Sequence, residues 1–367
     1  TGDDLVISTA TGIGTSATDA DLDTAVSNLE AVGGSGGVFI ANTGALTIGG
    51  IGGTEGVSAT GGAIEVSAAS PLVVDETVAN SGGGNITLTA TNDGGEDDDL
   101  TISANVTALG GDGAIDLNAG TDLVIDSAAI VSTVGNGAIT GDAVRSIDLR
   151  GNVLMETIAG DITLTANRGA AQTAGNFDGI ELTSSTIQTN SGAILLTGRG
   201  GNDATGNSDG VFVDSSTIRS TGAGTIELTG TATNGETSDG VDVDADAVPG
   251  TPSLITSVTG AITLTGTSAV DSGVEIQDGS VVSSTGTDAA AATITITGNA
   301  EEYAVYIGRS SGASGTTSVT SVNGAISITG IAQNESDSTG VWIEKAAQIT
   351  STGVGIDAAT ITINGTV

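Results

Sequence analysis

The sequence predicts an all-β protein with the architecture of a parallel β-helix, a solenoid in which each coil contributes three short strands. One observation is a seven-residue phrase that returns along the chain, and another is the alternation of apolar and polar residues within it. A third is that glycine-rich turns, and no helical pattern, separate most of these phrases. Self-similarity combined with strand periodicity is typical of a solenoid. The phrase reads GAITLTG at 260–266 and recurs as GAIEVSA at 62, GNITLTA at 84, GAIDLNA at 113, GDITLTA at 160, GAILLTG at 192, GTIELTG at 224 and GAISITG at 324.

The spacing of this phrase changes once along the chain. From Gly160 onward its starts follow one another every 32 to 36 residues, whereas before Gly160 the intervals are 18 to 29 residues. Loops of variable length on a constant core produce such variation. We therefore expect one continuous β-helix over 1–367, with shorter, irregular coils in 1–159 and regular coils of about 32 residues in 160–367. Twelve phrase starts predict about a dozen coils.

Each long repeat contains two further strand phrases. One is DGIEL at 178, which returns as DGVFV at 209, DGVDV at 239, SGVEI at 272, YAVYI at 303 and TGVWI at 339. The other is STIQT at 185, which returns as STIRS at 216, SLITS at 253, SVVSS at 280, SVTSV at 318 and AQITS at 347. Both alternate apolar and polar residues, so three strands per coil are expected.

Strand periodicity predicts which residues form the core. Ile162 and Leu164 should point inward while the threonine between them points outward. In the next coil Ile194 and Leu196 should lie above them, about 4.8 Å along the axis. One coil cannot bury its own apolar face, so stability must come from stacking. We expect the glycine that starts each phrase to supply unusual backbone angles at the corner of the coil.

Residues 19–31 are the one stretch with a helical pattern. Thr18 is placed to cap a helix there, and Gly33 and Gly34 are placed to end it. We expect this amphipathic helix to cover the end of a coil, because an apolar helical face must pack on something. The apolar residues stand at i, i+3, i+4 and i+7: Leu22, Ala25, Val26 and Leu29.

The composition limits the partners of the chain. Asp and Glu number 44 against 7 Lys and Arg, with no His, so the formal net charge is −37. This charge disfavours nucleic acids and anionic membranes as partners. No apolar run is long enough for a transmembrane helix, so membrane insertion is not expected. Aromatic residues are only 2%, which predicts a narrow core of small and β-branched side chains.

The repeats resemble those of filamentous-haemagglutinin-like proteins, which are very large bacterial surface proteins. The resemblance lies in the G-x-I-x-L-T phrase, in strands such as DLVI at 122–125, and in the segment 22–50, which is similar to a joint between modules of giant β-strand-repeat proteins. It implies a right-handed β-helix shaft at the bacterial cell surface. The Asn-Pro-Asn-Gly secretion signature and the Arg-Gly-Asp triplet do not occur in this sequence, so the resemblance implies neither export nor receptor binding.

The strand phrases at 3–9 and 359–365 lead us to expect that the chain stacks on further β-helix, either in the same polypeptide or in other copies. We predict an extracellular structural or adhesive protein that is not an enzyme. A carbohydrate-binding or polysaccharide-degrading β-helix is the alternative, since such enzymes use paired carboxylates or calcium with a basic residue. The seven basic residues are scattered and no histidine is available as a base, which favours the structural interpretation.

Carboxylates at one recurring position suggest a metal as cofactor. Asp178, Asp209 and Asp239 begin the second strand phrase of three successive coils. Stacked about 5 Å apart, they would repel one another unless Ca²⁺ bridged them. The alternative is a solvated acidic face that keeps molecules apart. Both interpretations remain open from the sequence.

A column of outward residues in the same strand phrase is the candidate contact surface. Three of the six aromatic residues of the chain fall in it. Aromatic rings beside carboxylates suit stacking on sugars or a contact with a neighbouring fibre, although ordinary strand propensity or a covering loop would also account for them. The residues proposed for this contact surface are Phe212, Glu275, Tyr306 and Trp342.

Overall fold

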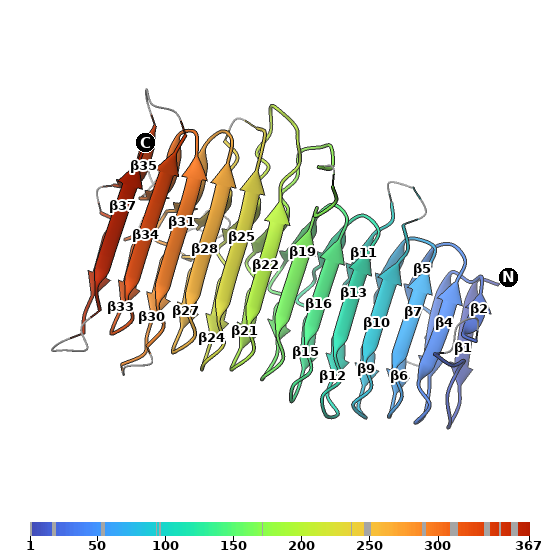
Figure 1. Ribbon diagram of the computed structural model, residues 1–367. Coiled ribbons are helices and arrows are strands. Elements are labelled where there is room, and N and C mark those ends of the chain that lie inside the picture. The colour runs from blue at the N-terminus through green and yellow to red at the C-terminus, as the bar shows by residue number, and fades with distance from the viewer. Residues whose placement is uncertain are drawn as a thin grey trace. The chain divides into compact units, whose positions relative to one another are not determined.

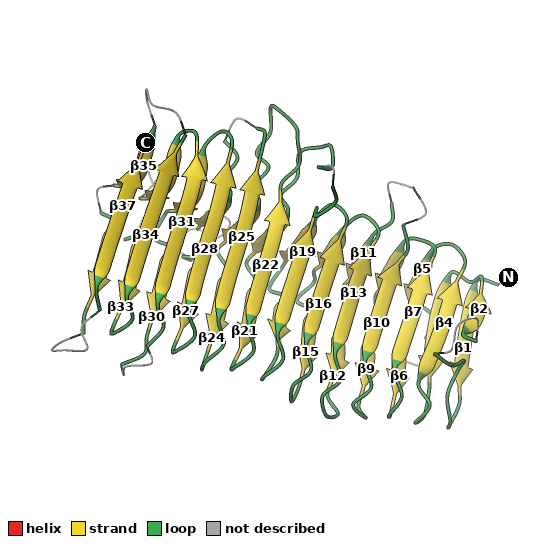
Figure 2. Cartoon of the chain, viewed as in Figure 1, coloured by secondary structure: helices red, strands yellow, loops and turns green. Residues whose placement is uncertain are grey.

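The computed structural model describes residues 2–16, 20–52, 56–92, 94, 97–170, 172–235, 237–245, 251–287, 291–308, 315–333, 338–344, 346–353 and 359–367. Regular structure in these residues consists of β-strands, with no helix (Figure 2). Accordingly, within these ranges no helix is long and apolar enough to cross a membrane. The chain divides into two compact units, Thr1–Thr163 (unit 1) and Leu164–Val367 (unit 2), and the boundary falls inside β19 (Ile162–Ala166).

Unit 1 contains three stacks of parallel strands (Figure 1). Successive strands of a stack come from successive coils, and each pairs in register with the next. The first stack comprises β4 (Val38–Asn42), β7 (Ile64–Ala68), β10 (Ile86–Ala90), β13 (Ile115–Ala119) and β16 (Ile139–Ala143). The second comprises β5 (Leu46–Ile48), β8 (Leu72–Val74), β11 (Leu100–Ile102), β14 (Leu123–Ile125) and β17 (Ile147–Arg150). The third comprises β6 (Val57–Ala59), β9 (Val78–Asn80), β12 (Val106–Ala108), β15 (Ile130–Thr133) and β18 (Leu154–Glu156).

The helix expected over 19–31 is wrong. Thr18 and Asp19 lie outside the described residues, and the rest of the segment contributes to β2 (Leu22–Thr24) and β3 (Asn28–Val32). Strand β3 pairs with β1 (Asp4–Ser8) on one side and with β5 and β6 on the other, and it buries Leu29 and Ala31 completely. The strand is favoured because it has hydrogen-bond partners on both sides and buries its apolar side chains in the core. These interactions stabilise it more than local helix propensity would stabilise a helix.

Unit 2 repeats the three stacks with longer strands. The first stack is β22 (Ile194–Arg199), β25 (Ile226–Ala232), β28 (Ile262–Ser268), β31 (Ile294–Ala300), β34 (Ile326–Ala332) and β37 (Ile361–Thr366), which lie side by side in Figure 1. The second is β20 (Ile180–Thr183), β23 (Val211–Asp214), β26 (Val241–Asp244), β29 (Ser272–Ile276), β32 (Tyr303–Ile307) and β35 (Thr339–Ile343). The third is β21 (Thr186–Thr189), β24 (Thr217–Ser220), β27 (Leu254–Ser257), β30 (Val281–Ser284), β33 (Ser318–Ser321) and β36 (Gln348–Ser351).

The predicted alternation of buried and outward residues is confirmed. In β28 the side chains of Ile262 and Leu264 are fully buried, and the threonines that follow each of them are partly exposed. The register pairs Ile262 with Ile226 on one side and with Ile294 on the other, so identical apolar residues stack through the core of unit 2. The all-β parallel solenoid predicted from the repeats is therefore the architecture of each unit.

Among the glycines that start the phrase, Gly44 has the expected left-handed backbone angle (φ 90°), but most of the others do not. Gly224 and Gly260 are not among the residues of the left-handed region. A Cβ on Gly224 would instead overlap the carbonyl oxygen of Gly192, and a Cβ on Gly260 would overlap that of Gly224. These positions require glycine because the backbones of successive coils approach closely there.

A second column of glycines closes the phrase in unit 2. Its members pair in register from strand to strand, and a Cβ on Gly298 would overlap the carbonyl oxygen of Ala304. Alanine occupies the corresponding place in unit 1, where the strands are shorter, as in Ala90 of β10. The glycine column therefore allows the longer strands of unit 2 to pass close to the second stack. Its members are Gly198, Gly230, Gly266, Gly298, Gly330 and Gly365.

Candidate functional site

A ladder of aspartates connects successive coils of unit 2. The Oδ1 atom of Asp178 accepts a hydrogen bond of 2.6 Å from the backbone N–H of Asp209. Asp209 Oδ1 accepts one of 2.6 Å from the N–H of Asp239, and Asp239 Oδ1 accepts one of 2.7 Å from the N–H of Ser272. The residues that the sequence marked as calcium ligands therefore each satisfy a backbone donor of the next coil.

Burial destabilises the ionised form of the carboxyl groups in this ladder. Asp209 is fully buried and Asp239 is 5% exposed. Desolvation raises the pKa of both carboxyl groups well above the usual range, and the negative charges of Asp178 near Asp209 and of Glu275 near Asp239 raise it further. The hydrogen bonds from the following coil oppose this effect because they stabilise the ionised form.

The carboxylates that converge most closely lie at the end of the ladder. One oxygen each from Asp239, Asp271 and Glu275 lies within 4.8 Å of the others. Of the three metal ligands expected from the sequence, only Asp239 belongs to this group of described residues. Asp271 was not identified as a site residue, and Glu275 was assigned only to the contact surface.

An exchange of two neighbouring residues explains why Asp271 was missed. The strand phrase opens with the second residue of Ser208-Asp209 and of Ser238-Asp239 in two coils, and with the second residue of Asp271-Ser272 in the next. Successive residues of an extended chain point to opposite sides, so this exchange puts the serine in the ladder and the carboxylate beside it. The inverted order of Asp271 and Ser272, directly after two coils with Ser-Asp, was the signal available in the sequence.

Glu275 is affected by burial, by neighbouring charges and by a hydrogen bond. Burial and the negative charges of Asp271 and Asp244 raise the pKa of Glu275 to about 7, although a 2.9 Å hydrogen bond from the hydroxyl of Ser272 lowers it. At neutral pH this carboxyl group is therefore close to half-protonated, a state in which it can either donate or accept a proton.

The outward column predicted as a contact surface is continuous in the structure. Register pairs place Phe212 beside Asp242, Asp242 beside Glu275, Glu275 beside Tyr306, and Tyr306 beside Trp342. The column changes character along its length. Asp242 is 5% exposed, whereas Trp342 is 42% exposed.

Tyr303 joins the aromatic end of this column, which the sequence analysis did not foresee. Its ring centroid lies 5.2 Å from that of Trp342 with the planes at 88°, and 5.9 Å from that of Tyr306 with the planes at 57°. The hydroxyl of Tyr306 donates a hydrogen bond of 2.6 Å to Glu344 Oε2. We call Tyr303, Tyr306 and Trp342 the aromatic cluster.

The aromatic cluster lies beside the three converging carboxylates of Asp239, Asp271 and Glu275, which we call the carboxylate group. Tyr303 pairs in register with Ser272, and Tyr306 pairs with Glu275. The backbone N–H of Tyr303 also donates to the carbonyl oxygen of Asp271 at 3.3 Å. Glu275 of β29 therefore lies next to the aromatic residues of β32 and β35, and Asp271 immediately precedes β29.

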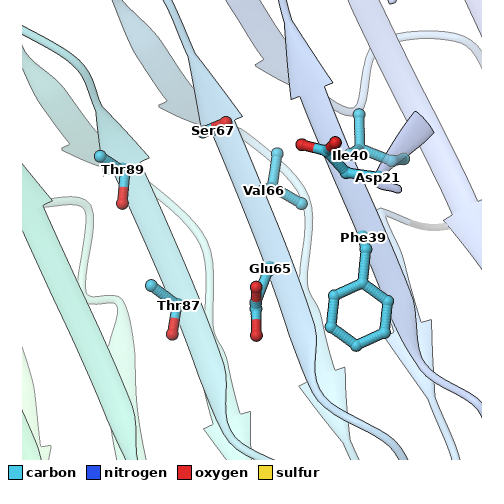
Figure 3. A pocket seen from close by; sticks show the side chains of 8 residues that line it. All are labelled: Asp21, Phe39, Ile40, Glu65, Val66, Ser67, Thr87 and Thr89. Atoms are coloured by element: carbon cyan, nitrogen blue, oxygen red, sulfur yellow. The ribbon is translucent and has the colours of Figure 1, made fainter. Parts of the chain in front are cut away.

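A small hollow lies on the surface of unit 1. Figure 3 shows Phe39 of β4 and Glu65 of β7 projecting side by side, with threonines of β10 beyond them. Its volume is about 130 Å³, well below the roughly 300–1,000 Å³ of small-molecule sites. Because Phe39 is only 6% exposed, the hollow offers little aromatic surface to a ligand.

Comparison with known proteins gives no match to a protein-family model, to a curated protein or to a solved structure. Inferences about function therefore rest on the fold and on the geometry of these two neighbouring groups.

Proposed function

We propose that this chain is a segment of an extracellular, non-enzymatic β-solenoid that forms the shaft of a bacterial surface fibre or giant adhesin. The observation that carries the proposal is the uninterrupted stacking within each unit. Among the described residues, successive coils of each unit pair their strands in register, as β25, β28 and β31 do. Such a structure extends by adding coils, and its length can grow without a change of core.

The proposal includes a right-handed solenoid of about a dozen coils. Connections between parallel strands of one sheet are right-handed in nearly all proteins, which supports this hand. The twelve starts of the strand phrase support the number of coils. The resemblance to filamentous-haemagglutinin-like shafts points in the same direction and supplies the bacterial cell surface as the location.

The chain is proposed to stack on further β-helix, from the same polypeptide or from other copies. Support comes from β37, which pairs with β34 and continues its column of inward isoleucines. In β34 the inward residue Ile328 is fully buried, whereas in β37 Ile361 and Ile363 are each 41% exposed. Another coil on β37 would bury these side chains and pair its free backbone groups.

The contact surface of the shaft is proposed to be the aromatic cluster with its flanking carboxylates. Trp342 offers an exposed ring that Tyr303 holds edge-on, and carboxylates lie at Glu344 and Glu275. Rings that stack on sugar faces, beside acceptors for sugar hydroxyls, suit a carbohydrate partner.

A second candidate function is cleavage of a polysaccharide. The observation that favours it is the raised pKa of Glu275 beside Asp239 and Asp271, because glycoside hydrolysis uses one protonated and one ionised carboxyl group. Incubation with acidic and neutral polysaccharides, followed by assays for reducing and unsaturated ends, separates the two functions. If the wild type cleaves a polysaccharide and Glu275→Gln does not, the chain is an enzyme and the structural proposal is wrong.

Electron microscopy of the native assembly tests the shaft. We expect continuous fibres in which antibodies to this chain label the shaft. Ile363→Lys places a charge on β37, where another coil would stack, and should interrupt the fibres. The control is Ile331→Lys. Ile331 points outward from β34 and is already 47% exposed, so this substitution should leave the fibres intact. Isolated compact particles in the native material would contradict the proposal.

A further inference from the structure

The carboxylate group at the end of the aspartate ladder is held in place by its surroundings. Asp239 is fixed by the hydrogen bond from the N–H of Ser272, and Glu275 by the hydrogen bond from the hydroxyl of the same serine. Ser268 Oγ accepts hydrogen bonds from the N–H groups of Val270 and Asp271 at 3.0 and 3.1 Å, which orders the turn that carries Asp271. The three carboxylates are therefore preorganised rather than free to move apart.

Within the described part of the chain, no basic side chain is among the charges that act most strongly on Asp239. The charges that act most strongly on Asp239 are those of Glu275, Asp209 and Asp271, and all of them are carboxylates. Arg145 with Asp122, and Arg150 with Asp126 and Asp148, are ion pairs of unit 1. Like charges in a desolvated place repel strongly unless a proton or a cation neutralises them.

Asp242 provides a second, independent indication of a missing partner. It is 95% buried, and its Oδ1 atom has no hydrogen-bond partner. Asp242 pairs in register with Glu275, and after burial the charges of Glu275 and Asp239 are the largest that raise the pKa of Asp242, so Asp242 adjoins these carboxylates. Buried carboxylate oxygens are rarely left without a donor or a metal ion.

We propose that Asp239, Asp271 and Glu275 bind a Ca²⁺ ion, with Asp242 adjoining them as a further source of negative charge. The oxygens lie within 4.8 Å of one another, and oxygens on opposite sides of a Ca²⁺ ion are about 4.6–5.2 Å apart. Three carboxylates leave several of the six to eight Ca²⁺ coordination positions to water or to a ligand. The site does not depend on the proposed fibre function.

The chemistry of the donors favours Ca²⁺ over other metals. Zn²⁺ prefers nitrogen and sulfur ligands, and the chain contains neither histidine nor cysteine. Mg²⁺ is usually held by one or two carboxylates together with phosphates and water, not by a cage of three protein carboxylates. Ca²⁺ accepts an irregular oxygen cage of this kind.

Calorimetric titration of the purified chain with CaCl₂, and terbium emission sensitised by the neighbouring Tyr303, measure the site directly. The variants are Asp271→Asn and Glu275→Gln, and the second keeps an oxygen that can accept the hydrogen bond from Ser272. The matched control is Glu227→Gln, which removes one charge from an exposed position in β25 on the other sheet of unit 2. Circular dichroism verifies that each variant remains folded.

We expect a saturable Ca²⁺ site in the wild type and in Glu227→Gln. Its affinity should fall by at least about tenfold in Asp271→Asn and in Glu275→Gln, because loss of a ligand weakens a site more than loss of an outer partner does. Ca²⁺ should also raise the melting temperature more than NaCl at equal ionic strength, and only where the site is intact. The absence of saturable binding in the wild type, or equal Ca²⁺ responses in Glu227→Gln and Asp271→Asn, would overturn the proposal.

Discussion

Asp239 accepts a hydrogen bond of 2.7 Å from the backbone N–H of Ser272, and with that bond the aspartate ladder of unit 2 ends. In the two preceding steps the donor residue is itself an aspartate, which in turn accepts a bond from the next coil. Ser272 instead directs its hydroxyl to Glu275. The end of the ladder thus concentrates negative charge at one place in a buried environment.

The stability of the metal-free chain should depend on pH through Glu275. Its pKa is 4.5 in the unfolded chain and about 7 in the folded one, so the folded state binds the proton more tightly. The stabilising contribution is fully present below pH 4.5 and is lost as the pH rises through about 7. Between pH 4.5 and about 7 we expect the free energy of unfolding to fall by at most about 3 kcal/mol, as measured by urea denaturation in the presence of a chelator.

Glu275→Gln is the control for this pH dependence. The variant lacks the titrating group but keeps the carboxylates that act on it, among them Asp271, Asp244 and Asp278. The difference in unfolding free energy between wild type and variant should therefore grow between pH 4.5 and about 7 and then level off. A difference that is independent of pH would show that Glu275 titrates normally.

Two substitutions at Asp209 separate its charge from its hydrogen bond. Asp209→Asn keeps an oxygen for the N–H of Asp239 and removes a fully buried charge, so it should stabilise the metal-free chain above neutral pH. Asp209→Ala leaves the buried N–H without a partner and should cost about 1–3 kcal/mol. Thermal denaturation of both variants tests the ladder, and equal effects would show that the hydrogen bond contributes nothing.

Gly298→Ala should destabilise unit 2 severely. The added Cβ would overlap the backbone carbonyl oxygen of Ala304, which cannot move without displacing β32. We expect a cost of at least about 3 kcal/mol in chemical denaturation. Gly365→Ala is the matched control from the same column, because the nearest atom to its Cβ would be the backbone nitrogen of Val341 at 3.1 Å, and its cost should be clearly smaller.

Trp342→Ala should weaken adhesion much more than stability. The ring is 42% exposed, and loss of its contact with Tyr303 should lower the free energy of unfolding by no more than about 2 kcal/mol. Retention on immobilised polysaccharides and on the native surface measures adhesion. Ile331→Ala, an exposed apolar residue on the other sheet, should leave retention unchanged. If Trp342→Ala unfolds the chain while adhesion of the folded fraction persists, the aromatic cluster is part of the packing and not a contact surface.

Outside residues 19–31, where a helix was expected and strands are found, the sequence by itself determined the alternation that forms the core. Alternation places Val274 and Ile276 inward in β29 with Glu275 between them, because a strand has a side-chain period of two wherever it lies. Repetition of the phrase also placed Glu275, Tyr306 and Trp342 in one column, since equivalent positions in successive coils stack in register.

Only the tertiary structure decided what lies beside these residues. Residues 22–31 carry a helical spacing, yet β1, β5 and β6 flank β3 and hold it as a strand. The ring of Tyr303 meets Trp342 of the next coil, and Asp239 meets Ser272 across 33 residues of chain. Contacts of this kind join coils whose connecting loops differ in length, so local sequence cannot specify them, and the free energy of packing between coils selects the final arrangement.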